Sequence, residues 1–221
     1  MTREDHLRSA AAQLGVELGA AQCGQLLAYL DLIAKWNKVY NLTAVRDPAE
    51  MLVQHLLDSL AVVAPLRRQT GSRALKLLDV GSGAGLPGVV IAITCPHVQV
   101  DCVDTVGKKS AFIQQVAAAL QLANLRGLHG RVENLSGPYD VISARAFASL
   151  ADLVSWSQQA LAPGGIWLAM KGKHPGAEIA ALPEGVAVFH VEQLSVPELS
   201  AERCIVWLRP RNGGGAADAG R

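Results

Sequence analysis

The segment Leu75–Gly88 constrains the fold more than any other part of the chain. It reads Leu-Lys-Leu-Leu-Asp-Val-Gly-Ser-Gly-Ala-Gly-Leu-Pro-Gly, an apolar run followed by alternating glycines. The run Leu75–Val80 is too short for a helix and suits a strand, whereas the apolar residues after Gly88 suit a helix. The segment therefore predicts a strand, a tight turn and a helix in that order.

The glycines of this turn indicate a binding loop. Gly81, Gly83 and Gly85 permit positive φ angles and allow a ligand to approach the backbone closely. The helix that follows presents free N–H groups and a partial positive charge to whatever occupies the turn. A turn that holds no ligand requires fewer glycines than these three, so we expect a ligand here.

Two classes of ligand suit such a loop. The residues Gly83–Gly88 fit the dinucleotide fingerprint G-x-G-x-x-G, which would make the chain an NAD-dependent oxidoreductase. Asp79 argues against that class, because its carboxylate would repel a pyrophosphate at the end of the strand. The same carboxylate attracts the sulfonium and ammonium groups of S-adenosylmethionine. We therefore favour S-adenosylmethionine over NAD as the ligand, since Asp-x-Gly-x-Gly-x-Gly is the pattern of Rossmann-like methyltransferases.

Composition limits the number of domains and the classes of protein that the chain can belong to. The 221 residues, half of them hydrophobic, allow one large domain or a domain with an appendage. A formal net charge of +1 excludes a strongly basic RNA-coating protein but not a local basic patch. The four cysteines form no CxxC pair, so we expect buried thiols in a reducing compartment and no metal site. Without an apolar signal segment or a run of about 20 apolar residues, we expect a cytoplasmic protein and no membrane contact.

The periodicity of the chain predicts helices first and then alternating strands and helices. We expect helices over 1–20, 20–39 and 47–63, the last capped by Asp47 and ended before Pro65, and then a polar loop over 66–74. Strands are predicted at 75–80, 98–104, 125–132, 139–143 and 165–171, with helices from Gly88 and at 108–122, 150–161 and 178–182. The segments 185–194 and 204–209 should close the sheet as an antiparallel hairpin.

These elements define the expected fold class and domains. The class is α/β, a Rossmann-like class I methyltransferase with a mostly parallel sheet, preceded by N-terminal helices. Residues 1–74 form a helical extension packed on the core, and residues 75–209 form the S-adenosylmethionine-binding domain. Residues 210–221 are rich in glycine and alanine and predict a disordered tail.

Further candidate ligand residues follow the predicted strands, where this fold binds its ligands. Asp104 ends the second strand and suits hydrogen bonds from ribose hydroxyls. Val132 and Glu133 follow the third strand, where an adenine edge could be read; a solvated loop is the alternative. Arg145 follows the fourth strand. It either points into the ligand cleft or forms a structural ion pair.

The chain resembles the RsmG (GidB) family of bacterial small-subunit ribosomal RNA guanine-N7 methyltransferases. The resemblance covers about residues 20–209 and is carried by these segments: Tyr40-Asn-Leu-Thr43, His55-Leu-Leu-Asp-Ser-Leu60, Leu78–Gly88, Gly107-Lys-Lys-Ser110, Arg131-Val-Glu133, Ser143-Ala-Arg-Ala-Phe-Ala148 and Met170-Lys-Gly172. It implies cofactor contacts at Gly81, Leu86, Val132, Glu133 and Arg145, with Asp104 as the ribose acid.

The implied reaction needs little from the protein beyond alignment. Guanine N7 carries a lone pair and no proton, so it can attack the methyl group without a general base. We therefore expect no catalytic base and no metal, with Arg145 in a positioning role at most. A class I methyltransferase with another RNA or a small-molecule substrate, or a non-catalytic RNA-binding module of the same fold, is the alternative.

RNA must reach the cleft, and N7 is inaccessible in the deep major groove of paired RNA, so the target should be unpaired. The expected partner is small-subunit ribosomal RNA or its assembling ribonucleoprotein, bound by a monomer. Candidate phosphate contacts are Lys35, Lys38, Arg46, Arg67, Arg68, Arg73, Lys171 and Lys173. His55 and Asp58 lie one helical turn apart, where a mutual hydrogen bond or a loop cap would give them a structural role.

Overall fold

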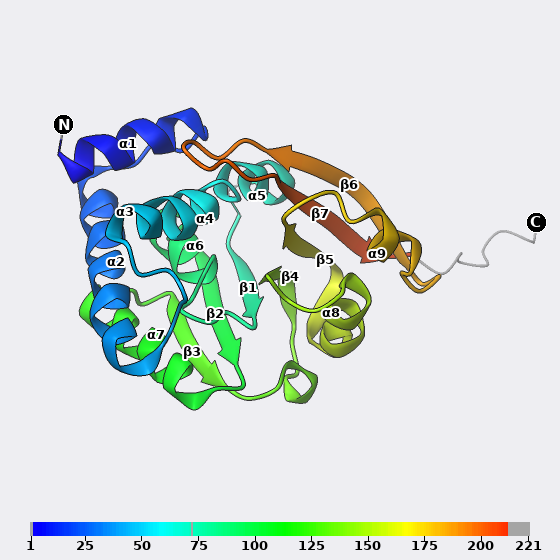
Figure 1. Cartoon of the computed structure of the whole chain (residues 1–221). Coiled ribbons are helices and arrows are strands. Elements are labelled where there is room, and N and C mark those ends of the chain that lie inside the picture. Colours follow the sequence, from blue (N-terminus) through cyan, green and yellow to red (C-terminus); the bar gives the residue numbers. More distant parts are fainter. Residues whose placement is uncertain (1, 72, 212–221) are drawn as a thin grey trace, which may run out of the picture.

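A single seven-stranded sheet organises the molecule (Figure 1). The structure is a computed structural model and describes residues 2–71 and 73–211. The strand order is β3-β2-β1-β4-β5-β7-β6. The strands are β1 (Leu75–Val80), β2 (Val98–Asp104), β3 (Leu125–His129), β4 (Tyr139–Arg145), β5 (Leu161–Lys171), β6 (Val186–Leu194) and β7 (Arg203–Pro210). Residues 212–221, most of the predicted disordered tail, lie outside the described residues.

The sheet is parallel except at its C-terminal end. β1 pairs in parallel with β2 and β4, β2 with β3, and β4 with β5. β7 runs antiparallel to β5 and to β6, because the short β6–β7 connection has no room for a crossover helix. The predicted fold class, with its closing hairpin, is confirmed.

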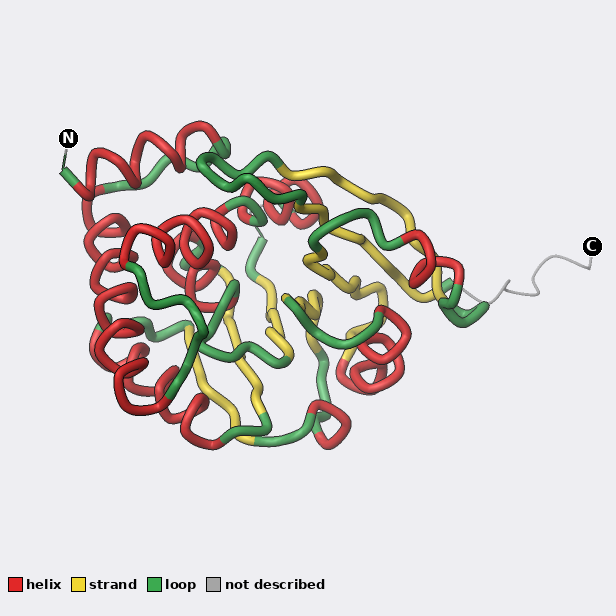
Figure 2. Tube along the Cα trace, in the orientation of Figure 1, coloured by secondary structure: helices red, strands yellow, loops and turns green. Residues whose placement is uncertain are grey.

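Helices cover both faces of the sheet (Figure 2), and most of the parallel strands are joined through a helix. α6 (Gly88–Thr94) and α7 (Gly107–Ala119) lie on one face together with the N-terminal helices. α8 (Leu150–Ser157) packs on the other face, in a second hydrophobic cluster, and α9 (Gly176–Ala180) lies beside it. The remaining elements are α1 (Arg3–Gln13), α2 (Ala20–Tyr40), α3 (Pro48–Met51), the π-helix η1 (Leu52–Leu57), α4 (Asp58–Leu60), α5 (Val63–Thr70) and the 3-10 turns η2 (Val132–Asn134) and η3 (Gln158–Ala160).

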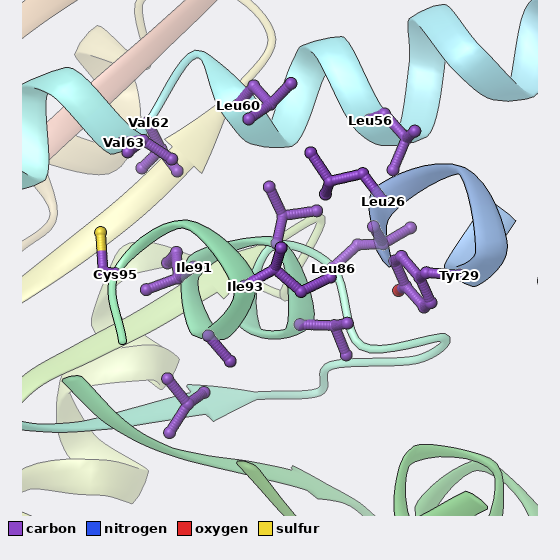
Figure 3. Packing of buried hydrophobic residues seen from close by; sticks show 14 of the residues in the cluster. Leu26, Tyr29, Leu56, Leu60, Val62, Val63, Leu86, Ile91, Ile93 and Cys95 are labelled. Carbon is purple, nitrogen blue, oxygen red and sulfur yellow. The ribbon is translucent and has the colours of Figure 1, made fainter. Parts of the chain in front are cut away.

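The N-terminal helices share one hydrophobic core with the sheet. α2 buries Leu26 and Tyr29 against Leu86 at the glycine turn, and Leu56 and Leu60 close the same layer from above (Figure 3). The apolar stripe of α2 thus faces α6 and α7 rather than solvent. The division into an extension, residues 1–74, and a cofactor domain, residues 75–209, stays a prediction.

Several predicted boundaries are wrong. The first helix ends at Gln13 rather than at residue 20, the third strand ends at His129 rather than at residue 132, and the helix predicted at 150–161 ends at Ser157.

The largest error is at Pro65. The chain is helical from Val63 to Thr70, so Pro65 does not end the helix and Leu66–Thr70 is not a loop. Helix α4 ends at Leu60, a turn follows, and Pro65 stands in the first turn of α5. Proline is tolerated there because the first turn of a helix has no intrahelical partner for its N–H groups.

Two further expectations concern apolar segments and thiols. The stretch Pro48–Thr70 is long and apolar enough to cross a bilayer by length and composition, but 72% of its most apolar window is buried inside the fold. Its helices therefore belong to the core. Cys23, Cys95, Cys102 and Cys204 are free and buried, as predicted.

Candidate active site

The glycine turn is held in shape by a carboxylate beneath it. Asp79 is fully buried and accepts hydrogen bonds from the backbone N–H of Gly88 at 2.9 Å and from the hydroxyl of Ser143 at 2.8 Å. The fit is close, since a Cβ at Gly88 would lie 2.9 Å from the Asp79 carboxylate and 2.4 Å from Cys102 Sγ. Asp79 therefore joins the end of β1 to the start of α6 and to β4.

The turn itself has the backbone conformation that its glycines predict. Gly81, Gly83 and Gly85 have φ values of 63°, 60° and 93°. A Cβ at Gly83 would meet no atom within 4 Å, so the outer side of the turn is open. On the inner side, the hydroxyl of Tyr29 donates a 2.6 Å hydrogen bond to the Ala84 carbonyl, which fixes the turn against α2.

A cavity of about 290 Å³ lies beside this turn at the ends of β1 and β2. We call it the cofactor cavity. Four of the predicted ligand residues line it: Gly81, Asp104, Val132 and Glu133. Val106, Phe147 and Trp156 add apolar walls, and Lys109 and Arg131 stand at its charged side. An apolar cavity with a few convergent polar groups is typical of small-ligand sites.

Asp104 connects the cofactor cavity to the glycine turn. Its Oδ2 accepts a hydrogen bond from Gly83 N–H at 3.0 Å and lies 3.5 Å from Lys109 Nζ, and its Oδ1 accepts from Val106 N–H at 2.9 Å. Each carboxylate oxygen has a second lone pair. A ribose hydroxyl in the cavity can therefore donate to Asp104 without displacing these bonds.

The other predicted cofactor residues lie outside this cavity's lining. Asp79, Gly85 and Leu86 are buried beneath the turn and shape it. Arg145, the last residue of β4, lines a neighbouring cavity, where its Nη1 donates to Gln54 O and to Asp58 Oδ2, both at 3.0 Å. The ion pair that the sequence left open as an alternative is thus present.

Sequence reasoning missed several residues of the site. Phe147 packs on Gly81, since a Cβ there would lie 3.0 Å from its ring, and its ring meets Trp156 edge-on at 5.6 Å. Trp156 is 40% exposed on a helix that buries Leu150, Leu153 and Val154 in the core, so the apolar periodicity of this helix does not indicate that Trp156 lines a ligand cavity. Ser143 and Tyr29 likewise read as ordinary strand and helix residues.

The basic residues predicted to contact RNA fall into two groups. Lys35, Lys38 and Lys173 are exposed. The others have partners within the protein, although Arg46, Arg68 and Arg73 are also exposed: Arg46 donates to Asn41 Oδ1, Arg67 donates to Thr94 O, Arg68 pairs with Glu192, Arg73 with Asp140, and Lys171 with Glu178. Paired guanidinium groups keep unused N–H donors, so these contacts reduce but do not remove their capacity to bind phosphate.

Comparison with known proteins identifies the family. Residues 22–206 match the GidB family, described as rRNA small subunit methyltransferase G. The chain belongs to this family. It is 66% identical over 215 residues to "Ribosomal RNA small subunit methyltransferase G" of Acidovorax sp. (strain JS42), covering 94% of this chain and 95% of that protein. Its counterpart from Paracidovorax citrulli is 63% identical over 97% of this chain and 91% of its own.

Solved structures of lower identity share the fold with this GidB-family chain. Magnesium protoporphyrin IX methyltransferase from Synechocystis PCC 6803, with bound S-adenosylhomocysteine, superposes with a TM-score of 0.60 at 14% identity, covering 81% of this chain and 98% of that one. TrmN from Thermus thermophilus superposes with a TM-score of 0.58 at 21% identity. This match covers 69% of this chain and 49% of the longer TrmN chain.

S-adenosylmethionine is the cofactor of this methyltransferase, and the residues present fit it. The open outer side of Gly83 leaves room for a ligand against the turn, and the hydroxyl of Ser82 in that turn is buried without a hydrogen-bond partner among the described residues. Asp104 offers the ribose acceptor, and Val132 with the two aromatic residues offers apolar walls for an adenine. Metal sites with three or more His, Cys, Asp or Glu side chains are absent from residues 2–71 and 73–211.

Asp79 gives the site a measurable pH dependence. Burial raises the pKa of its carboxyl from 3.8 to about 6, against the opposing hydrogen bonds from Ser143 and Gly88 and the charge of Arg145. A raised pKa in the folded state stabilises the protein below the unfolded pKa, and this contribution is lost as pH rises through about 6. We expect the unfolding free energy of the wild type, relative to Asp79→Asn, to fall by about 2 kcal/mol between about pH 4 and 7.

Urea unfolding of both proteins across this range measures the difference, and groups common to the two cancel. A difference that stays constant with pH would mean that Asp79 titrates at its ordinary value.

Proposed function

We propose that this chain transfers the methyl group of S-adenosylmethionine to N7 of a guanine in 16S ribosomal RNA. Membership of the GidB family over residues 22–206 carries the proposal. The carboxylate-supported glycine turn and the cavity beside it supply the binding site that such a reaction needs.

The chain's residues contribute binding, alignment and exclusion of water. S-adenosylmethionine supplies an electrophilic methyl group, and guanine N7 supplies its own lone pair. Asp104 and the apolar walls hold the donor, and Asp79 places a negative charge beneath the turn. Fixing two reactants in a near-attack geometry accounts for roughly 7–11 kcal/mol of a barrier. In this scheme no side chain acts as a general base, and Arg145 positions rather than reacts.

RNA contact in this proposal comes mainly from the exposed cations. Lys35 and Lys38 project from α2, and Lys173 follows β5. Charges that neutralise phosphates release counterions, so affinity for RNA falls steeply with salt. The target guanine has to be unpaired or extruded, because N7 of paired RNA faces a groove that side chains do not enter. We further propose that the enzyme acts in the cytoplasm as a monomer.

A methyl-transfer assay tests the proposed function. Small ribosomal subunits from a strain that lacks this modification are incubated with the full chain and tritium-labelled S-adenosylmethionine, and the RNA is then digested to nucleosides. We expect label in 7-methylguanosine from the small-subunit RNA, at a yield that declines with added salt. Label in another nucleoside, or none although S-adenosylhomocysteine binds, would point to a different substrate and contradict the proposal.

A further inference from the structure

A second cavity, of about 390 Å³, opens beside the cofactor cavity at the ends of β4 and β5. It is lined by Gln54, His55 and Asp58 on one side and by Arg145, Met170 and Arg203 on another. Its volume lies in the range of small-ligand sites, about 300–1,000 Å³. We call it the second cavity.

One short segment after β4 separates the two cavities. Arg145 and Ala146 line the second cavity, whereas Phe147 lines the cofactor cavity. Ala146 has a φ of 52°, a conformation that non-glycine residues adopt rarely and that is concentrated at functional sites. This turn directs its two flanking side chains into different cavities, so occupants of the two lie next to each other.

The wall of the second cavity is built on a π-helix. Gln54 and His55 belong to η1, and π-helical turns are rare and occur frequently at functional sites. The Gln54 carbonyl accepts from Arg145 Nη1 at 3.0 Å, while Asp58 accepts from Arg145 at 3.0 Å and from Arg203 Nε at 2.9 Å. Two cations around one carboxylate make this wall ordered and net positive.

His55 has hydrogen-bonding capacity that the fold does not use. It is 5% exposed, and neither Nδ1 nor Nε2 has a partner among the described residues. Both nitrogens are covered as the ring stands, so a rotation of the imidazole is required to bring one of them into the cavity. It does not bond Asp58, which the sequence had offered as one alternative. Burial lowers the pKa of the imidazole, and the neighbouring charge of Arg145 lowers it further. The ring is therefore neutral at pH 7, with one donor and one acceptor nitrogen.

We propose that the second cavity receives the target guanine, extruded from the RNA, and that the His55 ring turns to hydrogen-bond its Watson–Crick edge. This assignment rests on the proposed function. If N7 faces the methyl group in the cofactor cavity, the N1–H and 2-amino groups of the Watson–Crick edge point away from it, into the second cavity. Enzymes that act on a base extrude it and read its Watson–Crick edge in this way.

The lining suits a guanine on chemical grounds. Neutral imidazole accepts a hydrogen bond from N1–H or from the 2-amino group, or donates one to O6. Adenine has no donor at N1 and no 2-amino group, so a contact in which the unprotonated imidazole nitrogen accepts favours guanine. At the rim, Arg145 and Arg203 keep N–H groups that the described residues do not engage, and guanidinium groups bind the phosphate that accompanies an extruded nucleotide.

His55→Leu tests the assignment without a folding ambiguity. Leucine has a similar volume, and it removes two unpartnered buried nitrogens, so the melting temperature should stay the same or rise. We expect unchanged affinity for S-adenosylhomocysteine by calorimetry. The kcat/KM for unmodified small subunits should drop by about 10- to 100-fold, through loss of hydrogen bonds in a desolvated site. His55→Asn, which keeps a donor and an acceptor, should recover part of that loss.

Ser59→Ala is the matched control. Ser59 is also buried on this helical stretch, and its hydroxyl has no partner among the described residues, but it does not line the second cavity. Its replacement should leave stability and transfer unchanged.

Two outcomes overturn the assignment. One is a wild-type kcat/KM in His55→Leu. The other is a fall in melting temperature and in cofactor affinity large enough to account for the lost activity, which would mark a purely structural residue. A wild-type chain that methylates no subunits would instead refute the proposed function.

Discussion

Asp79→Ala is expected to abolish measurable binding of S-adenosylhomocysteine, a loss of at least about 100-fold. The change removes the acceptor for the Gly88 N–H and the Ser143 hydroxyl, and with it the link between β1, α6 and β4. The glycine turn then loses the side-chain contact that holds it against the sheet. It also loses a fully buried negative charge.

The variant should remain folded, which makes the binding experiment interpretable. Two orphaned donors in a buried site cost about 1–3 kcal/mol each. Burying the ionised carboxylate costs the wild type about 3 kcal/mol at pH 7, and alanine relieves that cost. Because these effects oppose each other, we expect the melting temperature to change by less than about 10 °C.

Asp79→Asn separates charge from geometry. The amide keeps the shape of the side chain and one acceptor oxygen, but no charge. If the charge contributes on the order of 1.4 kcal/mol across a partly dry gap, affinity falls about tenfold. Calorimetric titration of both variants, with circular dichroism to show that they are folded, makes the comparison. Unaltered affinity in folded Asp79→Ala would rule out Asp79 as the organiser of the turn.

The behaviour of Asp79 illustrates what the sequence could and could not predict. Its position before the glycines is local information, and so are the strand, the turn and the helix around it. Its partner Ser143 is not local, because the two meet only through the parallel register of β1 and β4, in which Asp79 lies opposite Ser143. A single sequence predicts alternating elements but does not contain the strand order that creates this pair.

Arg145 shows the same limit on a larger scale. Its place at the end of a strand was predictable, and a structural ion pair was one of two alternatives. The partner, Asp58, lies 87 residues earlier, on a helix that packs over the strand ends. The π-helical turn that brings Gln54 and His55 into the second cavity has no pattern distinct from an α-helix in sequence. The error at Pro65 has the opposite origin, since a correct local rule was applied without knowing where the preceding helix stops.

Asp58→Ala is expected to destabilise the protein by about 3 kcal/mol, the largest effect on folding that we predict. Asp58 is 3% exposed and neutralises Arg145 and Arg203, whose side chains are only 21% and 24% exposed. Without the carboxylate, two cations face each other in a partly desolvated wall. For a chain of this size the corresponding fall in melting temperature is about 6–12 °C.

A double variant tests whether uncompensated charge is the cause. Asp58→Ala with Arg203→Met removes one of the two cations, and part of the lost stability should return, because the remaining guanidinium keeps its bond to the Gln54 carbonyl. Asp31→Ala serves as the control: its ion pair with Arg3 is exposed on both sides, so its loss should cost about 0–1 kcal/mol. If Asp58→Ala lowers the melting temperature no more than Asp31→Ala does, the two arginines are solvated without Asp58. The second cavity would then lack the ordered cationic wall that we assign to it.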